Sequence, residues 1–148
     1  MSDNFFITGL PRSRTAWFSA FMTASGFPCG HELINNCETI EEYKEKVKDL
    51  SDSNTAFAFI SNPYPERKTL VIHRDDAPHK EFLVNLDVIN GLHVNFNDIH
   101  KRIDEIFNYL TNSDLNIEIY NKFKMLNITT MEEMNNEAAT RLYNATDK

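Results

Sequence analysis

Apolar and polar residues alternate along the chain in an order that predicts strands and helices in turn. An apolar run over 4–8 leads into Gly9, which is typical of a buried strand that ends in a tight loop. Over 15–25 the apolar side chains recur at helical spacing, and Gly26 follows as a stop signal. The segment 27–32 predicts a second strand or the loop around it.

Two capping boxes mark the starts of two further helices. Thr39 stands three residues before Glu42, and Thr130 stands three residues before Glu133. In such a box the threonine hydroxyl accepts a hydrogen bond from a backbone N–H of the first helical turn, and an apolar stripe follows. We therefore expect one helix from Thr39 and a last helix from Thr130.

The apolar runs 55–61 and 69–73 predict two strands in the centre of a parallel sheet, because both faces of each run are apolar. Only seven residues separate the two runs, whereas a parallel crossover needs about a dozen. Either these strands are not neighbours, or one of the predicted boundaries is wrong.

The second half of the chain predicts two helices and an edge strand. One helix begins at the acidic, proline-containing segment 75–78 and ends at Gly91, and another covers 99–110 with Asn97 as its cap. The alternating pattern over 115–120 predicts a strand with one exposed face. The whole order predicts a single α/β domain, a three-layer sandwich with a mainly parallel central sheet and a P-loop topology.

The composition favours a domain that folds without metals or disulfides. Of the 148 residues 41% are hydrophobic, and a domain of this size buries roughly 68–70% of its unfolded surface. Cys29 and Cys37 match neither a disulfide framework nor the paired spacing of a zinc site, so we expect no metal. The polar opening, and the lack of an apolar run of about 20 residues, predict a cytoplasmic protein without a membrane span.

The charge distribution favours a small anionic ligand over a polymer. A formal net charge of −7 repels a phosphate backbone, so nucleic-acid binding would need a local basic patch. The basic clusters are Arg12 with Arg14, and Arg67 with Lys68. Either cluster suits one phosphate-bearing molecule.

The loop between the first strand and the first helix is the strongest candidate for chemistry. A helix N-terminus presents unpaired N–H groups and partial positive charge, and a loop that wraps over it forms a nest for phosphate. The standard P-loop is Gly, four residues, Gly-Lys, then Ser or Thr. Here Gly9 and four residues are followed by Arg14-Thr15, without the second glycine or the lysine. An ordinary ATPase is therefore disfavoured.

The segment 11–17, Pro-Arg-Ser-Arg-Thr-Ala-Trp, resembles the sulfotransferase signature Pro-[Lys/Arg]-Ser-Gly-Thr-Thr-Trp, which binds the 5′-phosphosulfate end of PAPS. Arg14 stands where that family has glycine. Small sulfotransferase-like proteins encoded by bacteriophages look closer still, with Gly-Leu-Pro-Arg-Ser-Arg-Thr-Ala-Trp near the N-terminus. The resemblance covers the first third of the chain.

The resemblance implies which residues hold the nucleotide, PAPS or its product PAP. In the family's second motif an arginine follows a strand, with a serine eight residues later, and the pair holds the 3′-phosphate. Arg74 follows the predicted strand 69–73, but Phe82 stands in the place of the serine. The implied nucleotide-binding residues are Gly9, Pro11, Arg12, Ser13, Arg14, Thr15, Ala16 and Arg74.

Sulfuryl transfer also needs a base that takes the proton of the acceptor hydroxyl. His31-Glu32 follows the first helix, where some bacterial sulfotransferases place a glutamate and where the phage relatives also have His-Glu. The resemblance therefore implies Glu32 as the first candidate for the base, His31 as the second, and Arg12 as the residue that stabilises charge on the bridging oxygen. We expect the other histidines (His73, His79, His93 and His100) to be structural or on the surface.

Three functions remain open on the sequence. The first is a transferase that moves a sulfuryl group from PAPS to an unknown small acceptor. The second is a nucleotide or small-molecule P-loop kinase, although the loop lacks the usual lysine. The third is a catalytically degenerate module that binds a nucleotide or a host protein, because fold alone does not certify activity.

Overall fold

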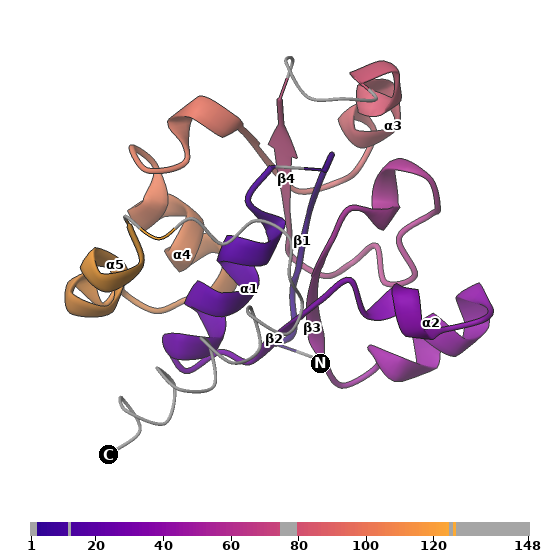
Figure 1. Ribbon diagram of the computed structural model, residues 1–148, viewed down its shortest axis with the longest axis horizontal. Helices are drawn as coiled ribbons and strands as arrows, with labels where there is room; N and C mark the ends of the chain where they lie inside the picture. Colours follow the sequence, from indigo (N-terminus) through magenta and orange to yellow (C-terminus); the bar gives the residue numbers. More distant parts are fainter. Residues whose placement is uncertain (1–2, 12, 75–79, 125, 127–148) are drawn as a thin grey trace.

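The computed structural model describes residues 3–11, 13–74, 80–124 and 126, and these form an α/β domain around a five-stranded parallel sheet (Figure 1). The order across the sheet is β2-β3-β1-β4-β5. The strands are β1 Phe6–Gly9, β2 Cys29–His31, β3 Ser51–Asn54, β4 Thr69–His73 and β5 Leu92–Asn95. The helices are α1 Thr15–Ala24, α2 Ile40–Lys46, α3 Leu83–Asp87, α4 Ile103–Thr111 and α5 Ile117–Lys124.

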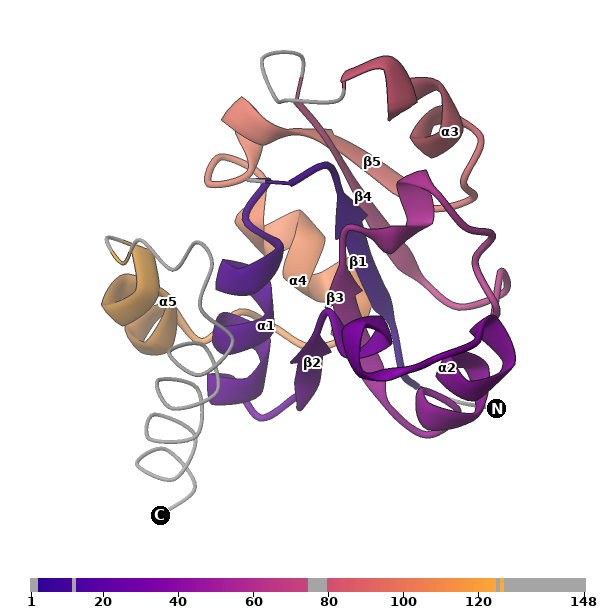
Figure 2. The same cartoon turned by 45° about the vertical axis from the view of Figure 1, so that its right-hand side comes forward.

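Helices cover both faces of the sheet, as the predicted layered architecture requires. Helices α1, α4 and α5 lie on one face, and α2 and α3 lie on the other (Figures 1 and 2). The larger core cluster is centred on the aromatic residues of α1, including Trp17 and Phe21, and it includes Leu70 and Ile72 of β4. Two smaller clusters fill the opposite face. The expected α/β class with a parallel sheet is confirmed.

The carboxyl end of β1 lies at the point where the chain changes direction. From β1 the chain passes through α1 to β2, returns to β3 beside β1, and then crosses to β4 on the other side of β1. The connections that follow β1 and β3 therefore run over opposite faces of the sheet. Ligands of open α/β sheets bind in the crevice at such a switch point.

Several predicted elements are confirmed. The first strand and helix, and the strand 69–73, match β1, α1 and β4, and 27–32 contains β2. Gly26 ends α1 with a φ of 96°, a left-handed value that favours glycine. Thr39 caps α2, because its side chain accepts a hydrogen bond of 3.0 Å from the Glu42 N–H.

The predicted strand over 55–61 is wrong. The strand of this region is β3, four residues earlier, and 56–58 forms a 3₁₀ turn. The turn begins because Asn54 Oδ1 accepts hydrogen bonds from the N–H groups of Ala56 (3.0 Å) and Phe57 (3.3 Å). The earlier strand end also resolves the short crossover, since β1 lies between β3 and β4 and the connection spans 55–68.

Strand β3 escaped prediction because its sequence, Ser-Asp-Ser-Asn, is entirely polar and yet fully buried. Burial of polar groups is tolerated when each finds a hydrogen-bond partner. Each of the four side chains has one: Ser51 with the Phe5 N–H (2.9 Å), Asp52 with Tyr43 (2.6 Å), Ser53 with the Thr15 carbonyl (2.6 Å) and Asn54 with Thr8 (3.0 Å).

The predicted strand over 115–120 is also wrong, because α5 forms there. Asn116 Oδ1 accepts hydrogen bonds from the N–H groups of Glu118 (3.0 Å) and Ile119 (3.2 Å), which starts a helix where the alternation indicated a strand. The core then takes Ile119, Tyr120 and Phe123, a helical spacing. The Trp17 Nε1–H holds the far end of α5 through the Phe123 carbonyl at 2.9 Å.

The remaining differences concern the region around α4. The helix begins at Ile103 with Arg102 as its N-cap, so Asn97 does not cap it, and Asn95 caps the preceding 3₁₀ turn 96–98. Strand β5, which comes directly after Gly91, was not predicted. The predicted helix start at 75–78, and the last helix from Thr130, lie outside the described residues. Among those described, no helix is long and apolar enough to cross a membrane.

Candidate functional site

The loop after β1 folds back tightly over the end of its own strand. A Cβ atom placed on Gly9 would lie 3.1 Å from both the Ile72 carbonyl oxygen and the Ser13 Cβ, tighter than nearly all real Cβ contacts. A larger residue at this position would push against the Ile72 carbonyl and Ser13, so glycine suits the close return of the loop across β4. The loop residues Leu10 and Ser13 are both fully buried.

Arg14 takes a backbone conformation that suits glycine better than arginine. Its φ of 70° and ψ of 22° are left-handed, and it is the N-cap residue of α1. A residue with a Cβ is held there at a cost of about 1–2 kcal/mol. The αL position coincides with the place where the signature that resembles this loop has glycine.

The start of α1 leaves polar groups without partners. Its N-cap makes no side-chain capping hydrogen bond, and the first N–H groups of a helix have no partner within the helix. The Ser13 side chain is also 0% exposed, and its Oγ has no hydrogen-bond partner among the described residues. A buried hydroxyl without a partner costs about 1–3 kcal/mol, so this loop carries unsatisfied hydrogen-bonding capacity.

Two guanidinium groups meet at one aromatic ring beside this loop. The Arg14 guanidinium lies 4.3 Å from the Phe96 ring centroid, and that of Arg74 lies 4.0 Å from the same centroid. Burial lowers the pKa of Arg14, and the neighbouring charge of Arg74 lowers it further. Among the described residues, no carboxylate forms an ion pair with Arg14. The two guanidinium groups are positively charged and partly removed from water, so they repel each other and favour the binding of an anion.

A second ring pair lies beside Arg14 on the side toward α5. His100 Nδ1 and the Tyr120 hydroxyl are 2.7 Å apart, and the His100 ring packs edge-on against Trp17. Burial, followed by the positive charges of Arg14 and Lys124, lowers the pKa of His100. His100 is therefore expected to be a neutral hydrogen-bonding group beside the loop at neutral pH. No local sequence pattern marks Phe96 or Tyr120 as part of this site, because they come from separate segments.

His31 contacts the first residue of α1. Its Nε2 is 3.3 Å from the Thr15 hydroxyl, and the side chain is buried at the carboxyl end of β2. Burial lowers the pKa of His31 to about 4, so the ring is neutral at physiological pH. The predicted second candidate for the base is therefore joined directly to the loop.

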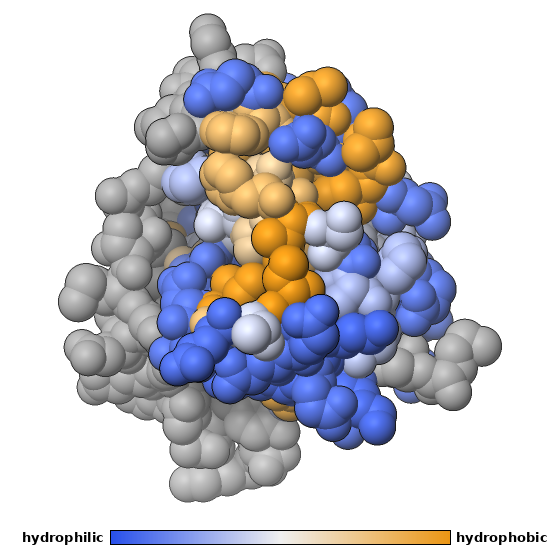
Figure 3. All heavy atoms as spheres, turned by 90° about the vertical axis from the view of Figure 1, so that its right-hand side faces the viewer, coloured by the Kyte–Doolittle hydropathy of each residue, from blue (hydrophilic) through white to orange (hydrophobic). Residues whose placement is uncertain are grey.

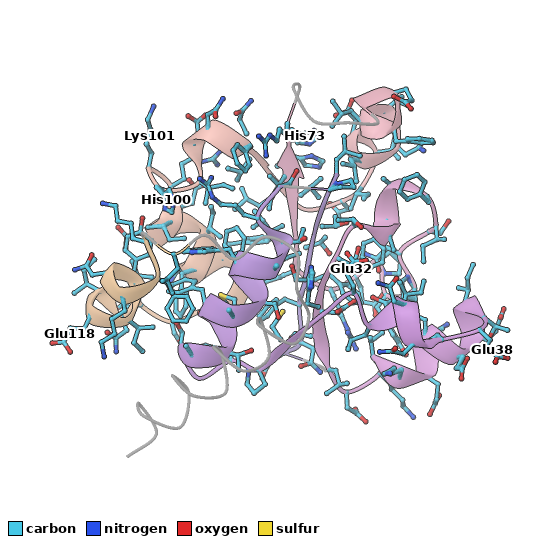
Figure 4. The ribbon with its side chains drawn as sticks, in the orientation of Figure 1. Glu32, Glu38, His73, His100, Lys101 and Glu118 are labelled. Carbon is cyan, nitrogen blue, oxygen red and sulfur yellow. The ribbon has the colours of Figure 1, made fainter. Side chains whose placement is uncertain are left out.

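Glu32 lies on the α2 side of the sheet, whereas His100 lies on the α1 side (Figure 4). The Glu32 carboxylate accepts a hydrogen bond from the Thr55 N–H, directly after β3. Burial raises the pKa of Glu32, and the hydrogen bond from Thr55 opposes that rise. Glu32 is therefore fixed on the β2–β3 side of the loop, while the arginines lie on the β4–β5 side.

The structure thus gathers most of the predicted site around one end of α1. Gly9, Ser13, Arg14 and Thr15 form the loop and the start of the helix, and Arg74 reaches Arg14 through Phe96. Pro11 lies in the same loop and Ala16 in the first helical turn. Arg12, the predicted charge-stabilising residue, lies outside the described residues.

Two of the histidines expected to be structural or on the surface form a hydrogen-bonded pair. His73 Nε2 is 2.7 Å from His93 Nδ1, and His93 Nε2 is 2.7 Å from the Ile89 carbonyl oxygen. Because a carbonyl only accepts, His93 donates through Nε2. Asp87 lies 3.5 Å from the other nitrogen of His73. His79 lies outside the described residues.

No family identity accompanies this geometry. Comparison of the chain with known protein families, with curated proteins and with solved structures found no match. Within the described part of the chain, no group of three or more His, Cys, Asp or Glu side chains is placed to hold a metal ion. A functional assignment therefore depends on the residues of the loop and their surroundings.

Proposed function

We propose that the chain is a sulfotransferase-like P-loop protein that binds a 3′-phosphoadenosine nucleotide at its 9–17 loop and transfers a sulfuryl group to a small acceptor. One observation carries the proposal: the left-handed Arg14 occupies the position where the sulfotransferase signature has glycine. Glycine takes αL without strain, and this chain adopts αL at that position although arginine disfavours it.

The surrounding residues fit a bound phosphate. The unpaired Ser13 hydroxyl and the open N–H groups at the start of α1 are donors, and a helix N-terminus favours anions. Arg14 and Arg74 bring two positive charges to the same edge. A phosphate would satisfy the donors and offset the repulsion between the two guanidinium groups.

Each residue then has a chemical role. When bound, PAPS supplies the sulfuryl group: its bridging S–O bond breaks as a new S–O bond forms to the acceptor oxygen, and the acceptor proton passes to a base. Arg12 keeps the role that the resemblance implies, stabilising charge on the bridging oxygen. Glu32 remains the first candidate for the base, because its raised pKa makes it a stronger base than His31.

A nucleotide-binding module without turnover is the second candidate, favoured by one contact. Phe82 stands where the family has the serine that holds the 3′-phosphate, and its ring packs on Phe59 with centroids 4.6 Å apart. Phe82 offers no hydrogen bond to phosphate, so Arg74 alone of the implied pair would serve that group. With this arrangement the site would select less strongly for a nucleotide that carries the 3′-phosphate.

Calorimetric titration with PAP, PAPS and ATP, each with and without magnesium, tests the proposal. We expect PAP to bind without magnesium, and at about 100 times its dissociation constant to stabilise the fold by about 2.7 kcal/mol. Arg14→Ala should weaken PAP binding about 100-fold, because it removes a charge-assisted contact. Magnesium-dependent binding of ATP alone would instead indicate the kinase, and no nucleotide response would overturn the proposal.

Turnover separates the enzyme from the binding module. Glu32→Gln keeps an oxygen for the Thr55 N–H, so we expect unchanged PAP affinity and loss of sulfated product. Equal turnover in this variant would remove Glu32 as the base. PAP binding without turnover toward any acceptor would indicate the second candidate.

A further inference from the structure

Glu32, the first candidate for the base, is held in a strained backbone conformation. Its φ of 53° and ψ of 41° are left-handed, which costs a residue with a Cβ about 1–2 kcal/mol. The Glu32 N–H donates to the Ser53 carbonyl at 2.9 Å, and this bond continues the pairing of β2 with β3 beyond His31. The backbone therefore fixes the point from which the Glu32 side chain extends.

Thr55 is the one residue in the described part of the chain that bonds to the Glu32 carboxylate, and it does so twice. Its N–H donates to Oε1, and its side chain forms a second hydrogen bond to the same carboxylate. No cation among the described residues pairs with Glu32. Burial raises the pKa of Glu32, and both bonds from Thr55 oppose that rise because they favour the charged form. Since one residue supplies both donors, its place in the fold decides the orientation of the carboxylate.

The Thr55 hydroxyl is available for this contact because another residue caps the turn that follows. Thr55 is the N-cap of the 3₁₀ turn 56–58, and a threonine in that position commonly bonds to N–H groups of the first turn. Here it makes no capping bond. Asn54 Oδ1 takes over this role and accepts from the first two N–H groups of the turn, at 3.0 and 3.3 Å. The hydroxyl is thereby left for Glu32.

The same asparagine ties the turn to the strand that leads into the proposed phosphate loop. Asn54 Oδ1 also accepts from the Thr8 hydroxyl at 3.0 Å, and the two residues are partners in the register of β1 and β3. Thr8 directly precedes Gly9, and Thr55 directly follows Asn54. The residue that holds Glu32 is therefore fixed relative to the start of the loop.

Packing holds this turn in place without the Thr55 side chain. Phe57 is 2% exposed, and its ring meets that of Phe6 edge-on with centroids 5.0 Å apart. Beyond the turn, apolar side chains of this segment and of α3 gather on one face (Figure 3), where Phe59 packs on Phe82. Thr55 itself is only partly buried. Loss of its hydroxyl should therefore leave the turn folded.

We propose that Thr55 is the positioning residue of the base, and that its N–H and hydroxyl hold the Glu32 carboxylate in the orientation that takes the acceptor proton. The inference rests on the proposed function, in which Glu32 is the base. In that reaction the acceptor O–H bond breaks as the new S–O bond forms, the proton goes to Glu32, and the electron pair of the bridging S–O bond leaves with PAP. A carboxylate held by two donors is already oriented for this transfer before the acceptor arrives.

Thr55→Val and Thr55→Ser are a matched pair, because valine removes the hydroxyl at nearly the same shape and serine keeps it. Carbon-13 NMR of the side-chain carboxyls of the full chain follows the titration of Glu32, and Glu32→Gln identifies its signal. We expect the titration midpoint of Glu32 to move to higher pH in Thr55→Val and to stay in place in Thr55→Ser. Thr55→Ala should repeat the shift, and a thermal melt checks that each variant is folded. An unchanged midpoint in both the valine and the alanine variant would overturn the positioning role.

Turnover of PAPS gives a second readout, measured as PAP release with phenol, butanol and butylamine offered together as acceptors. We expect Thr55→Val to lower kcat about tenfold and to move the acid limb of its pH profile to higher pH. The KM for PAPS should stay the same, and Thr55→Ser should restore the wild-type values. A higher KM with an unchanged kcat would place Thr55 in substrate binding and would contradict the inference.

The two readouts separate this inference from the proposed function. If wild type turns over PAPS and Glu32→Gln does not, but the Glu32 midpoint ignores the Thr55 hydroxyl, Thr55 is not the positioning residue and the proposed function stands. If the midpoint moves but PAP does not bind and PAPS is not turned over, the proposed function fails, and with it the base that Thr55 would position. A moved midpoint with an unchanged kcat and pH profile overturns the positioning role alone.

Discussion

At the start of α2 the chain supplies side-chain hydrogen-bond acceptors, whereas at the start of α1 it supplies none among the described residues. Thr39 Oγ1 accepts from the Glu42 N–H at 3.0 Å, and Glu42 in turn accepts from the Glu38 N–H at 2.5 Å. Arg14, the N-cap of α1, makes no side-chain capping bond. Two helices in one small domain thus differ in whether a side chain of the chain itself caps their first turn.

The contrast separates a structural helix start from a candidate binding site. At α2 the Thr39 side chain satisfies the Glu42 N–H of the first turn, and two glutamates in that turn complement the helix dipole. At α1 there is no acidic residue in the first turn, and arginine is the N-cap. Positive charge at a helix N-terminus is unfavourable for the isolated helix, so this arrangement makes physical sense when an anion completes it.

Buried titratable groups beside the two helices extend the comparison, and His31 beside α1 gives the largest expected effect. Its folded pKa is about 4, below its unfolded value of about 6.5. Its contribution to stability is therefore complete above pH 6.5 and is lost as the pH falls through 4. We expect up to about 3 kcal/mol of unfolding free energy to be lost in this window.

His31→Gln isolates that effect, because glutamine can bond to Thr15 but does not titrate. Urea unfolding of both proteins between pH 7.5 and 4 measures it. The stability difference between wild type and variant should change by about 3 kcal/mol over this range. A constant difference would show that His31 is not buried as a neutral ring.

Asp52, bonded to Tyr43 of α2, is expected to act with the opposite sign. Burial raises the pKa of Asp52 to about 6, and the Glu32 charge adds to the rise, whereas the Tyr43 hydrogen bond lowers it. The raised folded pKa stabilises the protein fully below about pH 3.8, and this stability is lost as the pH rises through 6. At pH 7.5 the ionised carboxylate therefore destabilises the fold.

Asp52→Asn removes the charge and keeps an oxygen for Tyr43. The added amide N–H has no evident partner, since Asp52 Oδ1 has none among the described residues. We expect a net gain of about 2 kcal/mol at pH 7.5, which disappears toward pH 4. Urea unfolding of wild type and variant between pH 7.5 and 4 measures this change in unfolding free energy. A loss of stability at pH 7.5 would contradict the raised pKa of Asp52.

Thr39→Ala removes the side-chain N-cap of α2. The variant loses the capping bond to the Glu42 N–H and should lower the unfolding free energy by about 1 kcal/mol. PAP affinity should stay the same, because the α2 cap is not part of the proposed site. Thermal unfolding and calorimetry on one sample check both expectations, and a fall in PAP affinity would show that the helix starts are coupled.

The fold could be predicted where local chemistry decides the structure. The Thr39 capping box and the apolar strand 69–73 carry their own signals, and both are confirmed. Strand β3 has no such signal, because it is buried through hydrogen bonds to distant residues such as Thr8 and Tyr43. For α5, the cap of Asn116 and the contact with Trp17 outweigh a strand-like alternation.

The candidate site also has one part that local sequence predicts and another part that depends on residues distant in the chain. The loop 9–17 could be located from sequence because its residues are contiguous and lie between a strand and a helix. Phe96, which joins Arg14 to Arg74, begins the 3₁₀ turn directly after β5, a strand that was not predicted from the sequence.

Arg14→Gly is expected to have the smallest effect on stability, and it sharpens the comparison most. Glycine relieves the left-handed strain at φ 70°, about 1 kcal/mol, but raises the entropy of the unfolded chain and removes the contact with Phe96. These contributions nearly cancel, so the unfolding free energy should change by less than about 0.5 kcal/mol. PAP affinity should nevertheless fall about 100-fold with the lost charge. Thr39→Ala is expected to do the opposite, with stability lost and PAP affinity kept. If either variant lost both stability and PAP affinity, capping and ligand binding would not be separated between the two helices.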